Sequence, residues 1–251
     1  MESAVQRFIR HTKHRLIYRL GGAPVEKIPP LLRQTEDAFK ALVRLGIPIH
    51  TFIDVGASNG SWSLLAKRHF PSSKFHLIEA QSCHHQVLEK LSGTDPSISY
   101  TLAAAADTTG QLYFDSSGGP FGGAASRQPL VGQDPENCVP CTTIDAEVKQ
   151  RTLAPPFLIK LDTHGFELPI LNGATGALKH SEALFIECYN FHPGENGLAF
   201  WEFCSFVAKL GFRPFDIVDP VHRPRDGILW QADILFLRSE RPEFSDSTWV
   251  G

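Results

Sequence analysis

Three side chains that could do acid–base chemistry follow apolar, strand-like runs in the second half of the chain. Asp162 ends one run, His164 comes two residues later, and His192 follows a second run that contains Glu187. Histidine titrates near neutral pH and suits general-base work, and a carboxylate can serve the same purpose. The carboxyl ends of neighbouring parallel strands converge on one crevice, so we expect Asp162, His164 and His192 to be the candidates for removing a proton from a hydroxyl group.

Each of these candidates has an alternative interpretation. The chain contains 11 histidines, and either His164 or His192 could be an ordinary surface residue. Asp162 could instead cap the helix expected near Glu167 or contact a bound cofactor. We favour a role for Asp162 at the cofactor site over a role as a helix cap alone.

A loop with two glycines follows the first apolar run of the chain. Asp54 ends that run, Gly56 and Gly60 stand four residues apart, and a helical pattern begins near Ser61. Glycine lets the backbone turn sharply and approach a ligand, and the free amides at the start of a helix favour a negatively charged group. Glu79 ends the next run, where an acidic side chain can accept hydrogen bonds from ribose hydroxyls. These residues predict a nucleoside-containing cofactor, with an ordinary strand-to-helix turn as the alternative.

Two features distinguish between cofactors of this kind. A dinucleotide-binding loop has the pattern G-x-G-x-x-G, whose middle glycine makes room for a pyrophosphate, and Ser58 occupies that place here. The last two expected strands are joined by the turn-rich segment 219–227, which has no helical period and predicts an antiparallel pair. S-adenosylmethionine has no phosphates, and class I methyltransferases end in such a pair. S-adenosylmethionine is therefore favoured, and a nicotinamide-dependent oxidoreductase is the alternative.

Short β-rich runs alternate with helical patterns from residue 49 onward. This alternation predicts an α/β protein with a largely parallel sheet and helices on both faces. The expected strands are residues 50–54, 74–79, 98–102, 111–115, 157–162, 183–188, 212–218 and 232–238. The expected helices are residues 60–69, 82–92, 167–179 and 197–210. Residues 115–137 are rich in Gly, Ser, Pro and Gln, which predicts a long irregular segment, either a lid or a loop.

The sequence pattern divides the chain into three parts. Residues 1–48 are expected to form an N-terminal helical extension, and residues 1–22 have the charge and spacing of a basic amphipathic helix. We expect this helix to pack on the main domain, with a membrane-surface helix as the alternative. Residues 49–240 are expected to form one catalytic domain, followed by a C-terminal tail at residues 241–251.

Composition counts against several classes of protein. The 24 basic and 27 acidic residues give a net charge of −3, which provides no general attraction to nucleic acid. The longest apolar run, Leu102 to Ala106, has five residues, whereas a membrane-spanning helix needs about 20. Five cysteines are too few and odd in number for a disulfide scaffold, so a reducing, cytoplasmic location is expected. Cys138 and Cys141 form a lone C-x-x-C. Asp162, Glu187 and His192 could supply hard ligands to a divalent ion, but no spacing demands one, so we expect no metal site.

Three segments make the sequence resemble the FkbM-type family of S-adenosylmethionine-dependent methyltransferases. They lie between residues 50 and 190. The segments are Phe52-Ile53-Asp54-Val55-Gly56-Ala57-Ser58-Asn59-Gly60 with Leu77-Ile78-Glu79, then Thr142-Thr143-Ile144-Asp145, and then Ile159 to Leu168 with Leu171-Asn172-Gly173-Ala174 and Phe185-Ile186-Glu187. The family usually has Asn at the place of Ser58 and Val-Glu at the place of Thr163-His164. These departures leave a catalytically inactive scaffold as a further alternative.

The resemblance implies a Rossmann-like class I fold with a mostly parallel seven-stranded sheet and S-adenosylmethionine as cofactor. It also implies methylation of a hydroxyl on a small molecule, sugar or glycan, with no nucleic-acid partner and with a homo-oligomer left open. Carried over residue by residue, it gives the following cofactor contacts: Asp54, Gly56 and Gly60 at the methionine end, Glu79 at the ribose, Asp107 near the adenine, and Ala57, Ser58, Ala80 and Asp162 beside them.

Overall fold

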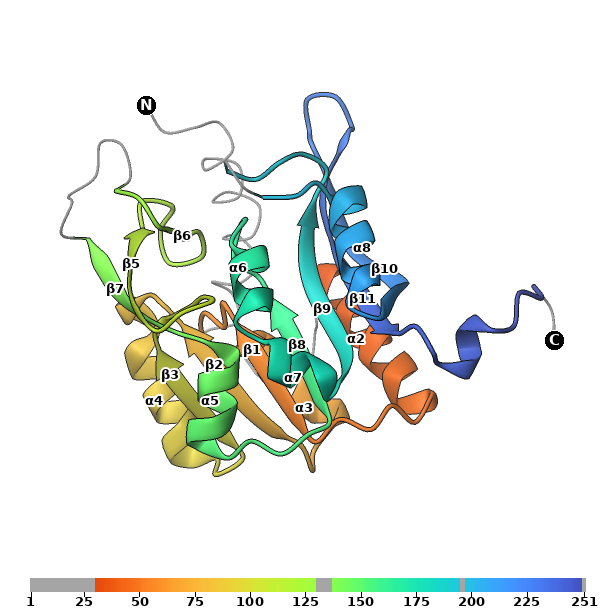
Figure 1. Cartoon of the computed structure of the whole chain (residues 1–251), viewed down its shortest axis with the longest axis horizontal. Coiled ribbons are helices and arrows are strands. Elements are labelled where there is room, and N and C mark those ends of the chain that lie inside the picture. Colours follow the sequence, from red (N-terminus) through yellow and green to blue (C-terminus); the bar gives the residue numbers. More distant parts are fainter. Residues whose placement is uncertain (1–29, 130–136, 195–196, 250–251) are drawn as a thin grey trace.

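A seven-stranded sheet forms the centre of the computed structural model, which describes residues 30–129, 137–194 and 197–249 (Figure 1). The strand order is β10-β11-β9-β8-β1-β2-β3. The strands are β1 Thr51–Val55, β2 Lys74–Glu79, β3 Ile98–Leu102, β8 Phe157–Leu161, β9 Ser181–Tyr189, β10 Phe212–His222 and β11 Leu229–Arg238. All neighbouring pairs are parallel except those of β11, which runs antiparallel to β9 and β10. The predicted α/β class, seven-stranded sheet and antiparallel final pair are confirmed.

Helices cover both faces of the sheet because its strands bury alternate residues on opposite sides. Phe52 and Leu158 pack into one apolar cluster, whereas the next residues, Ile53 and Ile159, pack into another. The helices of the first cluster are α2 Pro30–Arg44, α3 Ser61–His69 and α4 His85–Thr94. Those of the second cluster are α5 Ile144–Arg151, α6 Glu167–Asn172, α7 Thr175–Lys179 and α8 Phe200–Lys209. This arrangement confirms the prediction of helices on both faces.

The order of the strands reverses beside β1. From β1 the chain continues to β2 and β3 on one side, and β8 and β9 lie on the other. Val55 at the end of β1 stands opposite Ile78 and Leu161 in the two parallel neighbours, so the carboxyl ends of these strands share one edge. In open α/β sheets, ligands bind outside the carboxyl ends of the strands at such a reversal. The loops that the sequence analysis singled out therefore meet where a ligand site is expected.

A second, smaller sheet has the strand order β4-β7-β5-β6. Its strands are β4 Ala104–Ala105, β5 Gly110–Asp115, β6 Ala124–Ser126 and β7 Cys138–Thr142. The predicted strand 111–115 corresponds to β5, but neither β7 nor a separate sheet was predicted from the sequence. Residues 115–137 were expected to be irregular, whereas part of this segment forms β6; residues 130–136 lie outside the described residues. The pattern missed these strands because their pairing partners are distant in the sequence.

Two helical assignments also differ from the prediction. The expected helix 167–179 is divided into α6 and α7, because the Asp145 carboxylate accepts the amides of Gly176 and Ala177, both at 2.8 Å, and so starts a new helix. Helix α5 was not predicted. It begins where the Thr143 hydroxyl accepts the amide of Ala146 at 3.0 Å, which is a side-chain cap.

The regions on either side of the expected domain at residues 49–240 are only partly described. The predicted basic helix at residues 1–22 lies outside the described residues. Helix α2, within the predicted extension 1–48, packs on α3 and β10, and the Thr35 hydroxyl donates to Asp219. Within the predicted tail 241–251 the structure describes a short 3-10 helix, Pro242–Phe244. Among the described residues, no helix is both long enough and apolar enough to cross a membrane.

A buried polar network joins the main sheet to α5. Glu147 on α5 contacts His76 Nε2 on β2 at 3.0 Å, and it accepts the hydroxyls of Thr101 and Thr142 at 2.7 and 2.8 Å. Burial by itself would raise the pKa of Glu147, but the hydrogen bonds from His76, Thr101 and Thr142 outweigh it and lower the pKa to about 2. Glu147 therefore stabilises the fold as a carboxylate.

We expect the contribution of Glu147 to stability to be complete above about pH 4.5 and to be lost as the pH falls toward about 2, because the folded-state pKa is the lower one. The depression of the pKa corresponds to about 3 kcal/mol. Urea unfolding of the wild type and of Glu147→Gln should therefore show a difference in free energy of unfolding that shrinks over this pH range. Exposed Glu89→Gln is the control, and a difference independent of pH would contradict the prediction.

Candidate active site

A cavity of about 230 Å³ lies at the carboxyl edge of the main sheet. Its walls come from the loops after β1, β2 and β8, from β4 and from the β10–β11 pair. Seven of the predicted site residues line it: Gly56, Ala57, Ser58, Glu79, Ala80, Asp162 and His164. Four others are not among the described residues of its wall: Asp54, Gly60, Asp107 and His192. The structure thus brings both ends of the predicted site to one cavity and leaves four residues outside it.

The loop after β1 needs its glycines for two different reasons. Gly56 has φ +73°, and a Cβ there would lie 2.1 Å from the carbonyl oxygen of Asp162. No other residue fits, because this loop packs backbone against backbone on the corner after β8. Gly60 has φ +78°, precedes α3, and would place a Cβ 2.8 Å from the side chain of Leu91. Gly60 therefore shapes the turn into α3, and Gly56 shapes the cavity wall.

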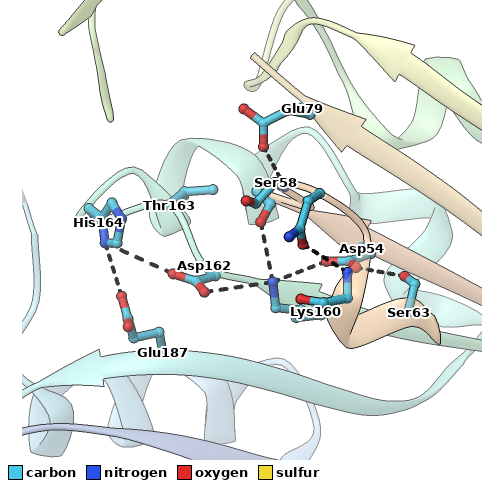
Figure 2. Close-up of polar contacts among 12 residues, drawn as sticks. Asp54, Ser58, Ser63, Glu79, Lys160, Asp162, Thr163, His164 and Glu187 are labelled. Atoms are coloured by element: carbon cyan, nitrogen blue, oxygen red, sulfur yellow. Dashed lines mark hydrogen bonds and ion pairs between the residues drawn. The ribbon is translucent and has the colours of Figure 1, made fainter. Parts of the chain in front are cut away.

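Asp54 lies beneath this loop and is fully buried. Its Oδ2 accepts the hydroxyl of Ser63 at 2.6 Å, and its Oδ1 lies 3.0 Å from Lys160 Nζ in an ion pair. Figure 2 shows Lys160 between Asp54 and Asp162, whose Oδ2 is 3.7 Å from Nζ. Lys160 also donates to the carbonyl of Gly56 at 3.3 Å. Asp54 thus acts on the loop through Lys160.

Glu79 ends β2 at the other side of the loop and is buried in the cavity wall. Its two carboxylate oxygens accept the backbone amides of Ser58 at 2.7 Å and of Gln81 at 2.8 Å. Burial raises the pKa of Glu79, and the bonds from Gln81 and Ser58 oppose that effect. Each oxygen accepts one amide and has a second lone pair for a further donor. Glu79 can therefore bind hydroxyl groups while holding the loop.

The corner after β8 places Asp162 and His164 in the cavity wall. His164 Nδ1 lies 3.0 Å from Glu187 Oε2 and 3.9 Å from Asp162 Oδ1 (Figure 2). The Tyr189 hydroxyl also lies 2.8 Å from this nitrogen. Glu187 and Tyr189 are on the neighbouring strand β9 and are buried. The corner therefore combines a partly exposed acid and histidine with a buried carboxylate and phenol.

A buried glutamate, Glu167, stabilises this corner through two hydrogen bonds. Its Oε1 accepts the amide of Gly165 at 3.0 Å and the hydroxyl of Thr163 at 3.1 Å. Burial raises the pKa of Glu167, and the amide of Gly165 opposes that effect. No side chain caps α6, so the alternative role of Asp162 as a helix cap is not observed.

Two predicted site residues have partners outside the cavity. The Asp107 carboxylate forms an ion pair with Arg127. His192 is exposed, and its Nε2 lies 2.7 Å from Glu202 Oε2. Their expected roles, near the adenine and as a base, gain no support from this placement.

Three further residues at the site were not predicted from the sequence: Lys160, Tyr189 and Gln231. A lysine inside an otherwise apolar strand was the available signal for Lys160. Glu187 was named only as an alternative ligand of a divalent ion. Its place beside His164 could not be predicted, because that place depends on the pairing of β8 with β9.

The size and charge of the side chains in the cavity wall suit S-adenosylmethionine. Five wall residues have small side chains that leave room for a flat ring: Ala57, Ala80, Ala103, Ala104 and Ala105. Four carboxylates line the wall: Glu79, Asp162, Asp219 and Asp233. Their negative charge suits a cationic sulfonium. Lys160 is the one lysine or arginine among the described wall residues, and it is ion-paired with Asp54.

The fold, with its antiparallel final strand pair, is the Rossmann-like fold of S-adenosylmethionine-dependent methyltransferases. The model of the methyltransferase FkbM domain matches residues 54–214. This match covers more than half of the 251 residues, and the chain belongs to the FkbM methyltransferase family. The expected family and cofactor are thereby confirmed.

Several solved methyltransferase structures are similar to this chain. The methyltransferase FkbM of Methylobacillus flagellatus KT is 19% identical, with a TM-score of 0.49, and the match covers 77% of this chain and 46% of that one. A putative O-methyltransferase from Klebsiella pneumoniae is 14% identical, with a TM-score of 0.48 and coverage of 95% and 91%. A putative RNA methyltransferase from Pyrococcus horikoshii is 12% identical, with a TM-score of 0.46 and coverage of 90% and 98%. The chain therefore spans about half the length of the Methylobacillus protein. None of the curated proteins matches the sequence.

We expect Lys160→Met to lower the free energy of unfolding by about 3–5 kcal/mol, because it leaves the buried Asp54 charge without its cation. Adding Asp54→Asn should recover part of this loss, since the uncompensated charge is then removed. Urea unfolding measures both effects, with exposed Lys90→Met as the control. A loss below about 1 kcal/mol would show that the ion pair contributes little.

Proposed function

We propose that the protein is an S-adenosylmethionine-dependent O-methyltransferase that acts on a hydroxyl of a small molecule or glycan. Membership in the FkbM family supports the methyltransferase class. One observation carries the finer statement: a single cavity is lined both by Glu79, which can bind a ribose, and by His164, which can accept a proton. A hydroxyl acceptor needs such a proton acceptor, because the neutral oxygen must lose its proton as it is methylated.

Residues on the two sides of the cavity would hold the two ends of the cofactor. Glu79 would accept hydrogen bonds from the ribose hydroxyls, and the alanines of the cavity wall would contact the adenine. The loop from Gly56 to Ser58 and the Asp162 carboxylate would hold the methionine part. When bound, the cofactor supplies a methyl group on a positively charged sulfur.

The corner after β8, with Asp162 and His164, is the reacting corner; it would position the acceptor and take up its proton. An in-line displacement requires the acceptor oxygen, the methyl carbon and the sulfur to be held in one line, with water excluded. As the new O–CH₃ bond forms and the C–S bond breaks, the hydroxyl proton would pass to His164. Asp162 would stabilise the resulting imidazolium, since its carboxylate lies 3.9 Å from Nδ1.

The other functions considered from the sequence receive less support. A nicotinamide-dependent oxidoreductase is disfavoured by membership in a methyltransferase family. An inactive scaffold was suggested by the departures at Ser58 and His164. Ser58 contacts Glu79 through its backbone amide, so its side-chain identity is not essential to that contact, and His164 keeps an acid–base group in the cavity.

Isothermal titration calorimetry with S-adenosylhomocysteine tests the cofactor site. We expect saturable binding by the wild type and about 10-fold or greater weakening in Glu79→Ala, because hydrogen bonds to a charged group are worth about 1.5–3 kcal/mol. The exposed residue Glu89 on α4 gives the matched control, and Glu89→Ala should bind like the wild type. Absence of binding by the folded wild type would refute the proposal.

Transfer of label from methyl-labelled S-adenosylmethionine into small-molecule and glycan fractions tests the chemistry. We expect His164→Gln to retain S-adenosylhomocysteine binding but to transfer label about 100-fold or more slowly, since loss of a general base typically costs 10²–10⁴ in rate. Exposed His192→Gln is the matched control and should keep its activity. Equal losses in both variants, or none in His164→Gln, would remove His164 from the reaction.

A further inference from the structure

Buried oxygen atoms of the adjacent strand surround one ring nitrogen of His164. Its Nδ1 lies 2.8 Å from the Tyr189 hydroxyl and 3.0 Å from Glu187 Oε2, and Figure 2 shows the contact with Glu187. Glu187 and Tyr189 stand two residues apart on β9, so they lie on the same side of the strand. The Glu187 side chain is fully excluded from solvent, whereas 14% of the His164 side chain is exposed. His164 thus connects the cavity to a buried acid.

The surrounding side chains hold Glu187 as a hydrogen-bond acceptor. Gln231 Nε2 donates to its Oε1 at 2.5 Å, and the Tyr189 hydroxyl donates to its Oε2. Burial and the nearby charge of Glu187 raise the pKa of Tyr189 well above its usual value, so the phenol keeps its proton. That proton points to Glu187, and the phenol oxygen therefore offers a lone pair toward His164. Both oxygens within hydrogen-bond reach of Nδ1 are acceptors.

We propose that Glu187 is a positioning residue that keeps the proton of neutral His164 on Nδ1 and so reserves the lone pair of Nε2 for the acceptor hydroxyl. A ring nitrogen that faces two acceptors is favoured as a donor, and the second nitrogen of a neutral imidazole is then unprotonated. A carboxylate in this place also stabilises the imidazolium that forms when a proton is taken up. The inference rests on the proposed function and assigns a further residue to the same site.

The backbone at His164 is held in an uncommon conformation. His164 has φ +55°, a conformation that is uncommon for a residue with a side chain. Gly165 follows with φ +109°, where a Cβ would lie 2.8 Å from the carbonyl oxygen of Pro193. The Glu167 carboxylate accepts the amide of Gly165 and so holds this turn. An unfavourable backbone conformation that its surroundings enforce is consistent with a functional requirement on the ring.

The same side chains could in principle hold a divalent cation. Asp162, His164 and Glu187 each offer one ligand atom, and these atoms lie within 4.8 Å of one another. A cation at this place would need Nδ1 without its proton, because a metal ligand donates a lone pair. The two interpretations therefore require opposite tautomers of His164, and one measurement distinguishes them.

Nitrogen-15 NMR of histidine-labelled protein measures the tautomer without any methyl acceptor. The His164 signals are assigned by their loss in His164→Gln. At alkaline pH, where the ring is neutral, we expect the wild type to show Nδ1 protonated and Nε2 unprotonated. A wild-type ring protonated mainly on Nε2 would overturn the proposal, and this test does not depend on any variant at Glu187.

Glu187→Gln is a near-isosteric variant that should reverse the tautomer. Gln231 donates to the Oε1 position, so the new amide is expected to keep its oxygen there and to place its NH₂ group beside His164. That group would donate to Nδ1 and move the ring proton to Nε2. Tyr189→Phe leaves the carboxylate in place and should keep the Nδ1–H tautomer. Glu202→Gln, which alters the exposed partner of His192, is the matched control and should leave His164 unchanged.

The remaining outcomes each decide the question. An unchanged tautomer in folded Glu187→Gln would show that Glu187 is only structural and would overturn the proposal. Stoichiometric Mn²⁺ that broadens the His164 signals of the wild type, but not those of Glu187→Gln, would assign the cluster to a cation and also overturn it. Calorimetry with S-adenosylhomocysteine on the same samples distinguishes failure of the proposed function from failure of the proposed role of Glu187. Failure to bind would refute the proposed function, and the tautomer would still be measured.

Discussion

A buried ion pair between Lys160 and Asp54 couples the parts of the protein from which the site is built. Lys160 is on β8 and Asp54 is on β1, the two strands that meet where the strand order reverses. The same ammonium group contacts the carbonyl of Gly56 and the carboxylate of Asp162. Charges removed from water must be compensated by partners in fixed geometry. One lysine therefore contacts both the loop on one side of the cavity and the corner on the other, and fixes their relative position.

Two buried glutamates stabilise the two sides of the site, Glu79 in the cavity wall and Glu187 beside His164. Glu79 accepts two backbone amides of the loop region, and Glu187 accepts an amide and a phenol from side chains of β11 and β9. In both, neutral donors satisfy a carboxylate that would otherwise be costly to bury. Figure 2 shows the resulting chain of polar contacts from Ser63 through Lys160 and Asp162 to Glu187. Hydrogen bonds from the protein itself therefore hold each acid in place.

Features that depend on neighbouring residues could be predicted from the sequence. Apolar runs and helical spacing gave the α/β class and the main strands, since these patterns report which face of an element is buried. The turn at Gly56, which lines the cavity, could also be predicted, because a sharp turn after a buried strand requires a positive φ. The divided helix at Gly173 and the missed helix α5 depend instead on Asp145 and Thr143, whose capping contacts are made only at a specific place in the fold.

The sequence by itself determined the family, the fold class, the loop at Gly56 and the place of Glu79, because motif order and local periodicity record these. Only the tertiary structure decided which side chains meet at the reacting corner. His192 lies on the surface beside Glu202, while Glu187 and Tyr189 come to His164 through the pairing of β9 with β8. The physical reason is that strand order and the face that a strand turns to its neighbour are set by contacts between distant segments, which no local pattern contains.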